Sequence, residues 1–309
     1  MNIYKDLYNE AINNSSFRKL SGEELKSVQK CVLDIYKHVA SVCKKNGLMI
    51  MLGGWSVLGA VRHKGFIPWD DDMDLNMPRA DYDKLIELCK EGVLGDKYDF
   101  AYPNKMMDAS SAFLKIYRMD TEIIGLEGPS SKYPNCLKID IFPIEGTSSN
   151  KCVRHIKGWT ANIIRLIGNM VDESSPWNQI KKELYSRNLR FYIFMRCRQL
   201  LGRIFSIVEH KQWICWYDRY VKNPIIGDVV VIPTGRQLYN GETLPSSVFF
   251  PVSKGIFEGI EVNLPADPDA YLTNLYGDYM QIPPENKRES HLIIDLQLPK
   301  QFYKSTSVE

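Results

Sequence analysis

The sequence lacks the cysteine pattern of a disulfide-stabilised protein. Its seven cysteines are scattered, and no two of them form a C-x-x-C pair. An odd number without regular spacing is typical of reduced thiols in the cytoplasm rather than of a disulfide framework. We therefore expect the fold to depend on its hydrophobic core.

Long apolar runs are also missing. No stretch reaches the roughly 18–20 uncharged apolar residues that a membrane-spanning helix needs, and the polar first 19 residues contain no apolar signal-peptide segment. Both absences predict a cytoplasmic protein. The net charge of +2 gives no indication of a nucleic-acid partner, while 309 residues with 44% hydrophobic content are enough for a sizeable core.

Helical and strand periodicities alternate through the first half of the chain. Ser21 and Glu24 form a capping-box pattern, which predicts the start of an amphipathic helix. The elements expected after that start are a helix over 25–42, a strand over 48–52, a helix over 56–62, a strand over 73–77, a helix over 79–89, and strands over 112–117 and 137–142. This order predicts a sheet domain over residues 1–150 with flanking helices, of the α/β or α+β class; we adopt α+β with a mixed sheet.

The middle of the chain has a different composition. Residues 151–222 contain 14 Lys and Arg against 5 Asp and Glu, together with many aromatic residues at helical spacing. We predict a helical insertion over residues 151–225. Two interpretations stay open: an interfacial patch that contacts an anionic membrane peripherally, or a plain helical subdomain with a solvated basic face.

Strand character returns in the last part, residues 226–309. We expect strands over 229–232 and 256–264 and a helix over 267–276 that complete the domain. From residue 281 onward the chain contains prolines and we expect irregular structure.

The acidic run of Asp70, Asp71, Asp72 and Asp74 needs a local reason, because carboxylates this close repel one another. On a strand, residues two apart point to the same face, so Asp72 and Asp74 would together present two carboxylates. Such a pair is suited to a hard divalent cation such as Mg²⁺. The alternative is a solvated acidic loop, which the apolar flanks on both sides disfavour.

A Gly-Gly turn precedes this run. Gly53 and Gly54 lie between a buried strand and a helix, where glycines allow close backbone approach and the helix N-terminus can bind phosphate. Arg62, His63 and Lys64 lie between the turn and the acidic run and would offer positive charge to phosphate oxygens. Their alternative interpretation is a solvent-facing helix end.

A third carboxylate is expected on a neighbouring strand. Asp140 lies between two isoleucines, and a lone buried carboxylate is costly unless it is hydrogen-bonded or functional. We interpret Asp140 as functional.

These motifs together resemble the LicD family, which includes bacterial phosphorylcholine transferases and is related to the fukutin-type ribitol-phosphate transferases. The resemblance is carried by residues 53–74, 77–79 and 139–143, and by the C-terminal segments 271–272, 276–280, 283–284 and 288–291. The helical middle matches only loosely. The resemblance implies a nucleotidyltransferase-like fold and an enzyme that transfers a phospho-alcohol from a CDP-linked donor to a glycan or its lipid-linked precursor, with phosphocholine as the first expectation for the transferred group.

The resemblance also implies roles for individual residues. Asp72, Asp74 and Asp140 would be the catalytic metal ligands for Mg²⁺ or Mn²⁺, with Asp70 as a fourth carboxylate. Gly53, Gly54 and Ser56 would meet the donor phosphates. Further candidates for substrate contacts are Lys115, Arg118, Arg288 and His291. The pair Trp55-Ser56 departs from the family, which more often has a threonine there, but the serine keeps the hydroxyl.

The expected reaction is in-line attack of a sugar hydroxyl on the distal phosphorus, with loss of CMP and Asp140 as general base. CDP-ribitol or CDP-glycerol could replace CDP-choline as the donor. Two rival functions are a nucleotidyltransferase acting on another small substrate and a non-catalytic glycan-binding relative.

Overall fold

A mixed sheet forms the centre of the protein. The structure, a computed structural model, describes residues 11, 17–105, 112–125, 134–288 and 290–303. The strand order in the sheet is β2-β3-β7-β5-β4, and β8 and β9 extend it from β7. The strands are β2 (Met51–Leu52), β3 (Asp74–Pro78), β4 (Tyr98–Ala101), β5 (Leu114–Arg118), β7 (Lys138–Gly146), β8 (Val229–Val231) and β9 (Thr243–Pro245).

The pairing of β3 with β7 decides where the carboxylates lie. These two strands are parallel, and their register places Asp74 directly beside Asp140. On the other side of β7, antiparallel β5 places Lys115 beside Asp140. Three charged residues that are far apart in the sequence therefore occupy adjacent positions in three neighbouring strands.

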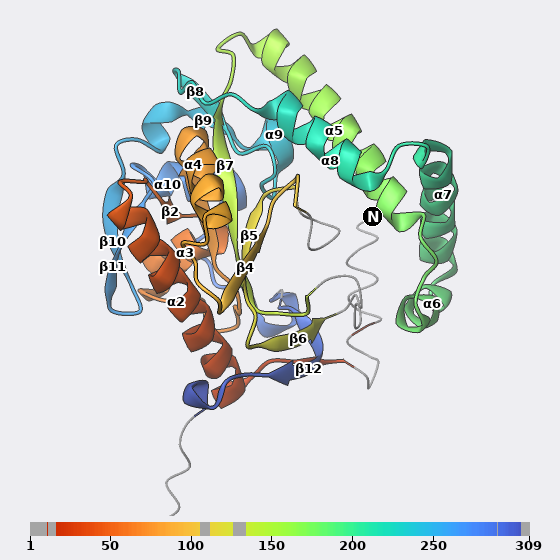
Figure 1. Cartoon of the computed structure of the whole chain (residues 1–309), viewed down its shortest axis with the longest axis horizontal. Coiled ribbons are helices and arrows are strands. Elements are labelled where there is room, and N and C mark those ends of the chain that lie inside the picture. Colours follow the sequence, from red (N-terminus) through yellow and green to blue (C-terminus); the bar gives the residue numbers. More distant parts are fainter. Residues whose placement is uncertain (1–10, 12–16, 106–111, 126–133, 289, 304–309) are drawn as a thin grey trace, which may run out of the picture.

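Helices pack around this sheet, as Figure 1 shows. They are α2 (Gly22–Lys45), α3 (Gly54–His63), α4 (Arg79–Lys90) and α10 (Pro268–Tyr276). The face of α2 that packs into the core repeats at steps of three and four residues, as the periodicity predicted. Ser21 is the N-cap of α2 as predicted, but no hydrogen bond from its side chain caps the helix. The expected capping box is therefore wrong in that detail.

Two smaller sheets were not expected. The segment after residue 281, predicted to be irregular, contains β12 (Leu292–Gln297), which pairs with β1 (Arg18–Lys19) and β6 (Glu122–Gly125). The single strand predicted over 256–264 is a hairpin of β10 (Ser253–Phe257) and β11 (Ile260–Leu264), which turns at Gly259 with a positive φ of 76°.

The middle of the chain is helical, as its spacing predicted. It contains α5 (Lys151–Glu173), α6 (Gln179–Ser186), α7 (Leu189–Phe205) and α8 (His210–Val221), and the short α9 (Leu238–Gly241) follows β8. The helices α5 and α8 run side by side, and α6 and α7 lie at the far end of that pair (Figure 1). None of the described helices has the length and hydropathy that crossing a bilayer requires.

A buried ion cluster fastens the helical region to the sheet domain. The guanidinium of Arg79, only 2% exposed, donates to Glu145 of β7 at 2.8 Å and to Asp218 of α8 at 2.7 and 3.0 Å.

The α+β class expected from the sequence is confirmed. One large hydrophobic core contains side chains from both the first 150 residues and the last 85, so these two segments pack as one body.

Candidate active site

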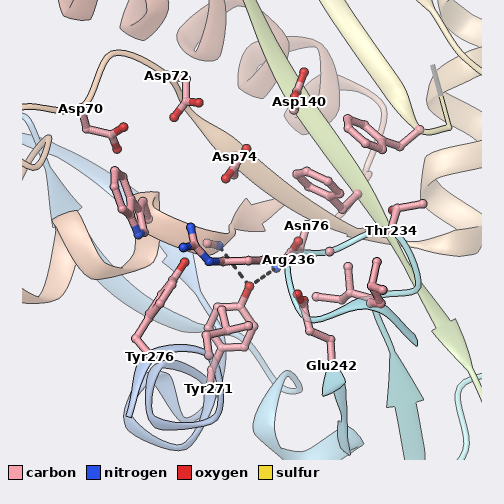
Figure 2. A pocket seen from close by; sticks show the side chains of 18 of the residues that line it. Asp70, Asp72, Asp74, Asn76, Asp140, Thr234, Arg236, Glu242, Tyr271 and Tyr276 are labelled. Carbon is pink, nitrogen blue, oxygen red and sulfur yellow. Dashed lines mark hydrogen bonds between the residues drawn. The ribbon is translucent and has the colours of Figure 1, made fainter. Parts of the chain in front are cut away.

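A pocket of about 910 Å³ lies beside the parallel pair β3 and β7. Figure 2 shows Asp70, Asp72, Asp74 and Asp140 along one side of it. We call these four, with Asp71, the acidic wall. Thr234, Arg236, Glu242, Tyr271 and Tyr276 face them across the pocket, and we call these the opposite wall.

The structure brings the three predicted metal ligands into this one pocket. Asp74 and Asp140 are neighbours in register, whereas Asp72 precedes the first residue of β3. The strand-parity argument for Asp72 and Asp74 therefore does not apply, because Asp72 is not on a strand. Its carboxylate reaches the pocket from the segment that leads into β3.

The acidic wall is electrostatically crowded. Burial raises the pKa of Asp74 well above its usual value, and the charges of Asp72 and Asp140 raise it further. The pKa of Asp70 is also raised well above its usual value, first by burial and then by Asp72, Asp71 and Asp74. Burial raises the pKa of Asp72 too, partly offset by His291. A wall of this kind favours whatever positive charge enters the pocket.

The wall offers the ligand type that Mg²⁺ prefers but no preassembled cage. Among the described residues, no three His, Cys, Asp or Glu side chains converge as a metal site would require. Mg²⁺ in phosphate-transfer sites commonly uses only one or two carboxylates, the remaining ligands being water and substrate phosphate. The donor set therefore fits an ion that arrives with its substrate.

Two cationic side chains already contact the acidic wall. Lys115, 3% exposed, donates from Nζ to the two carboxylate oxygens of Asp140 at 3.3 and 3.4 Å. His291 Nδ1 lies 2.6 Å from Asp71 Oδ1, and Nε2 lies 3.9 Å from Asp72 Oδ2. The hydrogen bond to Asp71 raises the pKa of His291 to about 9, so this imidazole is positively charged at neutral pH. Both predicted substrate-contact residues therefore lie in the pocket.

The Gly-Gly turn makes room for pocket side chains. A Cβ on Gly54 would lie 2.7 Å from Asp74 Oδ2, and one on Gly53 would lie 2.8 Å from Asn76 Oδ1. Gly54 also has a positive φ of 45°, which disfavours any side chain, and its N–H donates to the Tyr271 hydroxyl at 3.0 Å. The two glycines therefore allow the side chains of Asp74 and Asn76 to approach the backbone closely. Of the two glycines, only Gly54 lines the pocket where a donor phosphate would bind.

Ser56 does not line the pocket. It is 3% exposed, and its Oγ accepts a hydrogen bond from the N–H of Asp74 at 3.0 Å. The hydroxyl expected to contact phosphate instead fixes the backbone of a pocket carboxylate.

Arg62, His63 and Lys64 are placed away from the pocket. They lie at the C-terminal end of α3, a helix of ten residues and therefore about 15 Å long. The pocket is at its N-terminal end. Arg62 donates to the carbonyl of Tyr279 at 2.5 Å and to His63 Nε2 at 3.0 Å, which ties α3 to the segment after α10.

Of the other two arginines predicted to contact substrate, one lies in the pocket and one in the core. Arg288 lines the pocket, with its guanidinium 4.5 Å from the centre of the Trp69 ring. Arg118 is buried away from it and pairs with Asp34 and Asp120, so the structure gives it a role in packing.

The opposite wall was missed in the sequence. Thr234 is 5% exposed, and its Oγ1 has no hydrogen-bond partner among the described residues. The same is true of the buried Nη1 of Arg165, which lines the pocket from α5. Burial of unpaired polar atoms is costly, so both atoms mark a place where a polar ligand would be stabilised.

Glu242 adds a buried acid to the same wall. Its carboxylate accepts the N–H of Gln237 at 2.8 Å, yet burial raises its pKa to about 7. Gly235 leaves it space, since a Cβ there would lie 2.2 Å from Glu242 Oε2. The only signal available in the sequence was the turn-forming run Pro233-Thr234-Gly235, and Tyr271 belonged to the family resemblance without a role.

Comparisons with known proteins match this chain to one family and to two relatives. Residues 47–161 match the family model described as "LicD/FKTN/FKRP, nucleotidyltransferase domain". The chain is 24% identical over 273 residues to the lipopolysaccharide cholinephosphotransferase LicD of Haemophilus influenzae, covering 87% of this chain and 96% of that protein. It is also 25% identical over 114 residues to an uncharacterized protein of Rickettsia prowazekii, covering 29% of this chain and 41% of that one. The family match includes β3, the acidic wall and β7.

Proposed function

Because this chain is a LicD-family phosphotransferase, we propose that it transfers a phospho-alcohol, in the first instance phosphocholine, from a CDP-linked donor to a sugar hydroxyl of a cell-surface glycan or its lipid-linked precursor. The named relative supports phosphocholine as the group and lipopolysaccharide as the class of acceptor. CDP-ribitol and CDP-glycerol are the alternative donors.

The observation that carries the proposal is the register of β3 against β7. It sets Asp74 beside Asp140, with Asp72 in the same pocket and Lys115 within 3.3 Å of Asp140. Phosphoryl transfer is accelerated mainly by positioning and by neutralising charge on the phosphates. A pocket that combines crowded carboxylates with nearby cations suits that task.

A divalent cation, Mg²⁺ or Mn²⁺, is part of the proposal. Asp72, Asp74 and Asp140 would hold it, and it would supply positive charge to the diphosphate oxygens. Its arrival would also relieve the repulsion that raises the pKa values of Asp70 and Asp74.

The protein's own residues would do the remaining work. Asp140 is the proposed acceptor of the proton from the attacking hydroxyl, and Lys115 orients that carboxylate through its ion pair. The Ser56 hydroxyl, by accepting the Asp74 N–H, holds the start of β3 in place. His291, tied to Asp71, adds positive charge close to Asp72.

The opposite wall would bind the nucleotide part of the donor. Arg236 reaches into the pocket between the walls in Figure 2, with its guanidinium 5.9 Å from the centre of the Tyr276 ring. The unpartnered Thr234 Oγ1 and Arg165 Nη1 would gain hydrogen bonds from a nucleotide. The aromatic and aliphatic lining, which includes Phe142 and Leu275, is suited to a base and ribose.

The test is calorimetric binding of CDP-choline, CDP-ribitol, CDP-glycerol and CMP, each with and without Mg²⁺. Tighter, metal-dependent binding of CDP-choline than of CMP is the expected result. Preference for another CDP-alcohol would keep the reaction and change the transferred group. If no CDP compound binds, or if binding ignores the metal, the proposed donor and cofactor are both refuted.

A further inference from the structure

An apolar stripe runs along the outer side of α5. Its members are three or four residues apart, so they share one face of the helix. They are all exposed, and Ile156 and Trp159 are 68% and 66% exposed. The stripe consists of Val153, Ile156, Trp159, Ile163 and Leu166. Apolar side chains of this size on one helix face indicate a surface that something else covers.

Part of the same face is already covered inside the protein. Met170 lies seven residues, or two turns, beyond Ile163 and therefore on the same side of α5. There α7 packs so closely that a Cβ on Gly202 would lie 1.8 Å from the Met170 carbonyl oxygen. Only the N-terminal part of the stripe is left exposed.

The helix that covers the far end has an apolar outer face of its own. Leu189, Ile193, Leu200 and Ile204 of α7 are all more than half exposed and again fall at helical spacing. The residues that α7 buries, such as Phe191 and Met195, lie on its other side. Because α7 contacts α5 at Met170, on the stripe side, the two exposed apolar faces lie on neighbouring helices.

The charges on the α7 part of this surface have one sign. The helix α7 contains four arginines and no acidic residue. Arg190, Arg196 and Arg203 are exposed, and their positions along the helix place them beside the apolar face. A partner protein helix would be matched by the apolar residues alone, whereas arginines around them fit a partner that is both apolar and anionic.

We infer that the outer faces of α5 and α7 form a docking surface for an anionic lipid bilayer. The helices would lie in the interface with Trp159 at headgroup level, since no described helix can span the membrane. Arg165 lies between Ile163 and Leu166 in the sequence but lines the pocket from another face of α5. Docking would therefore leave only the thickness of one helix between the pocket and the lipid, about 10–12 Å.

This surface is independent of the proposed donor and can be tested without substrate. The full chain is co-sedimented with vesicles of phosphatidylcholine alone and with vesicles that also contain phosphatidylglycerol, at low and high salt. Two double variants probe the surface: Ile193→Ser with Leu200→Ser, and Arg190→Ser with Arg203→Ser. The matched control is Ile256→Ser with Ile282→Ser, two exposed isoleucines outside the helical region.

The expected result is binding to the anionic vesicles at least about tenfold tighter than to neutral ones, weakened by salt. Both surface variants should lose most of it, and the isoleucine control should keep it. The inference is overturned if the wild type ignores anionic vesicles or if the surface variants bind like the control. It is also overturned if light scattering shows a dimer that the Ile193/Leu200 variant dissociates while vesicle binding is absent, because the face would then join two copies of the chain.

Discussion

The two walls of the pocket are built in opposite ways. Four of the five carboxylates of the acidic wall lie within residues 70–74, and the fifth, Asp140, joins them through one strand pairing. The opposite wall draws Thr234 and Arg236 from the loop after β8, Glu242 from the segment before β9, and Tyr271 from α10. Arg165 of α5, in the helical region, lines the pocket as well, and we group it with the opposite wall.

This difference also separates two kinds of chemistry. The acidic wall carries repulsion that a cation would relieve, with pKa values raised by burial and by neighbouring carboxylates. The opposite wall carries polar atoms without partners that a ligand would satisfy. We expect substitutions in the acidic wall to lower turnover and to remove the effect of Mg²⁺ on donor binding. Substitutions in the opposite wall should weaken binding of the nucleotide itself.

The largest effect is expected for Asp74→Asn. Loss of this carboxylate should lower kcat by about a thousandfold or more, because charge neutralisation at the phosphates is the main source of rate. Thermal stability should stay near that of the wild type, since the substitution removes a charge from a crowded site. Steady-state release of CMP and thermal unfolding measure both, with Asp96→Asn on an exposed loop as the control. Retained turnover would remove Asp74 from the catalytic set.

The next effect is the contribution of Glu242 to the pH dependence of the free energy of unfolding. Its folded pKa of about 7 lies above its ordinary value of 4.5, so between these values the folded state holds a proton that the unfolded state has released. The free energy of unfolding should therefore fall as pH rises through this window, by about 1.4 kcal/mol per pKa unit and roughly 3 kcal/mol in all. Urea unfolding at pH 5 and pH 8 should show a loss that is larger in the wild type than in Glu242→Gln by this amount, because the raised pKa values of Asp70 and Asp74 contribute equally to both proteins. Equal pH dependence in both proteins would contradict it.

A smaller effect is expected for Thr234→Val and Arg165→Gln. Each removes one proposed hydrogen bond to the nucleotide, which should weaken CMP binding by about tenfold. Thr234→Val should not lower thermal stability, because the hydroxyl it removes is buried without a partner in the described structure. Calorimetry measures the affinity for CMP, and steady-state release of CMP measures kcat. A fall in kcat with unchanged affinity would contradict the proposed difference between the two walls.

The smallest effect is expected for Ser56→Ala. The Asp74 N–H would lose its acceptor, which costs about 1–3 kcal/mol of stability when the group stays buried. Turnover should fall about tenfold or less with KM unchanged, because Ser56 positions Asp74 without touching substrate. A large rise in KM would instead place the Ser56 hydroxyl on the donor phosphates.

Much of the fold could be predicted because its signals are local. Helix α2 shows its periodicity over 24 residues, and α10 begins within one residue of the start expected at residue 267. The strand β12 could not be predicted, because its partners β1 and β6 are more than 160 residues away and it follows a proline-containing segment. The hairpin of β10 and β11 turns through two residues with a positive φ, Glu258 and Gly259, which a run of apolar residues does not reveal.

The site also has one part with a local signal in the sequence and one part that depends on long-range packing. The crowded run at residues 70–74 is visible in the sequence. Which end of a helix faces a pocket is not visible, so Arg62, His63 and Lys64 were expected to contact phosphate although they lie at the end of α3 away from the pocket. The roles of Asp72, Asp74 and Asp140 stay predictions. Tyr271 and Tyr276 of the opposite wall lie in segments that carry the family resemblance. Thr234, Arg236 and Glu242 have no local signature, because they are ordinary residues until the fold brings them to the pocket.

The most direct test of the account combines one ligand, one metal and one substitution. CDP-choline binding is measured by calorimetry with and without Mg²⁺, for the wild type and for Asp74→Asn. We predict that Mg²⁺ tightens binding to the wild type and leaves the variant unchanged, while the metal-free affinities of the two proteins agree. If Mg²⁺ tightens binding equally in both, the acidic wall does not hold the metal against the donor, and the central claim is contradicted.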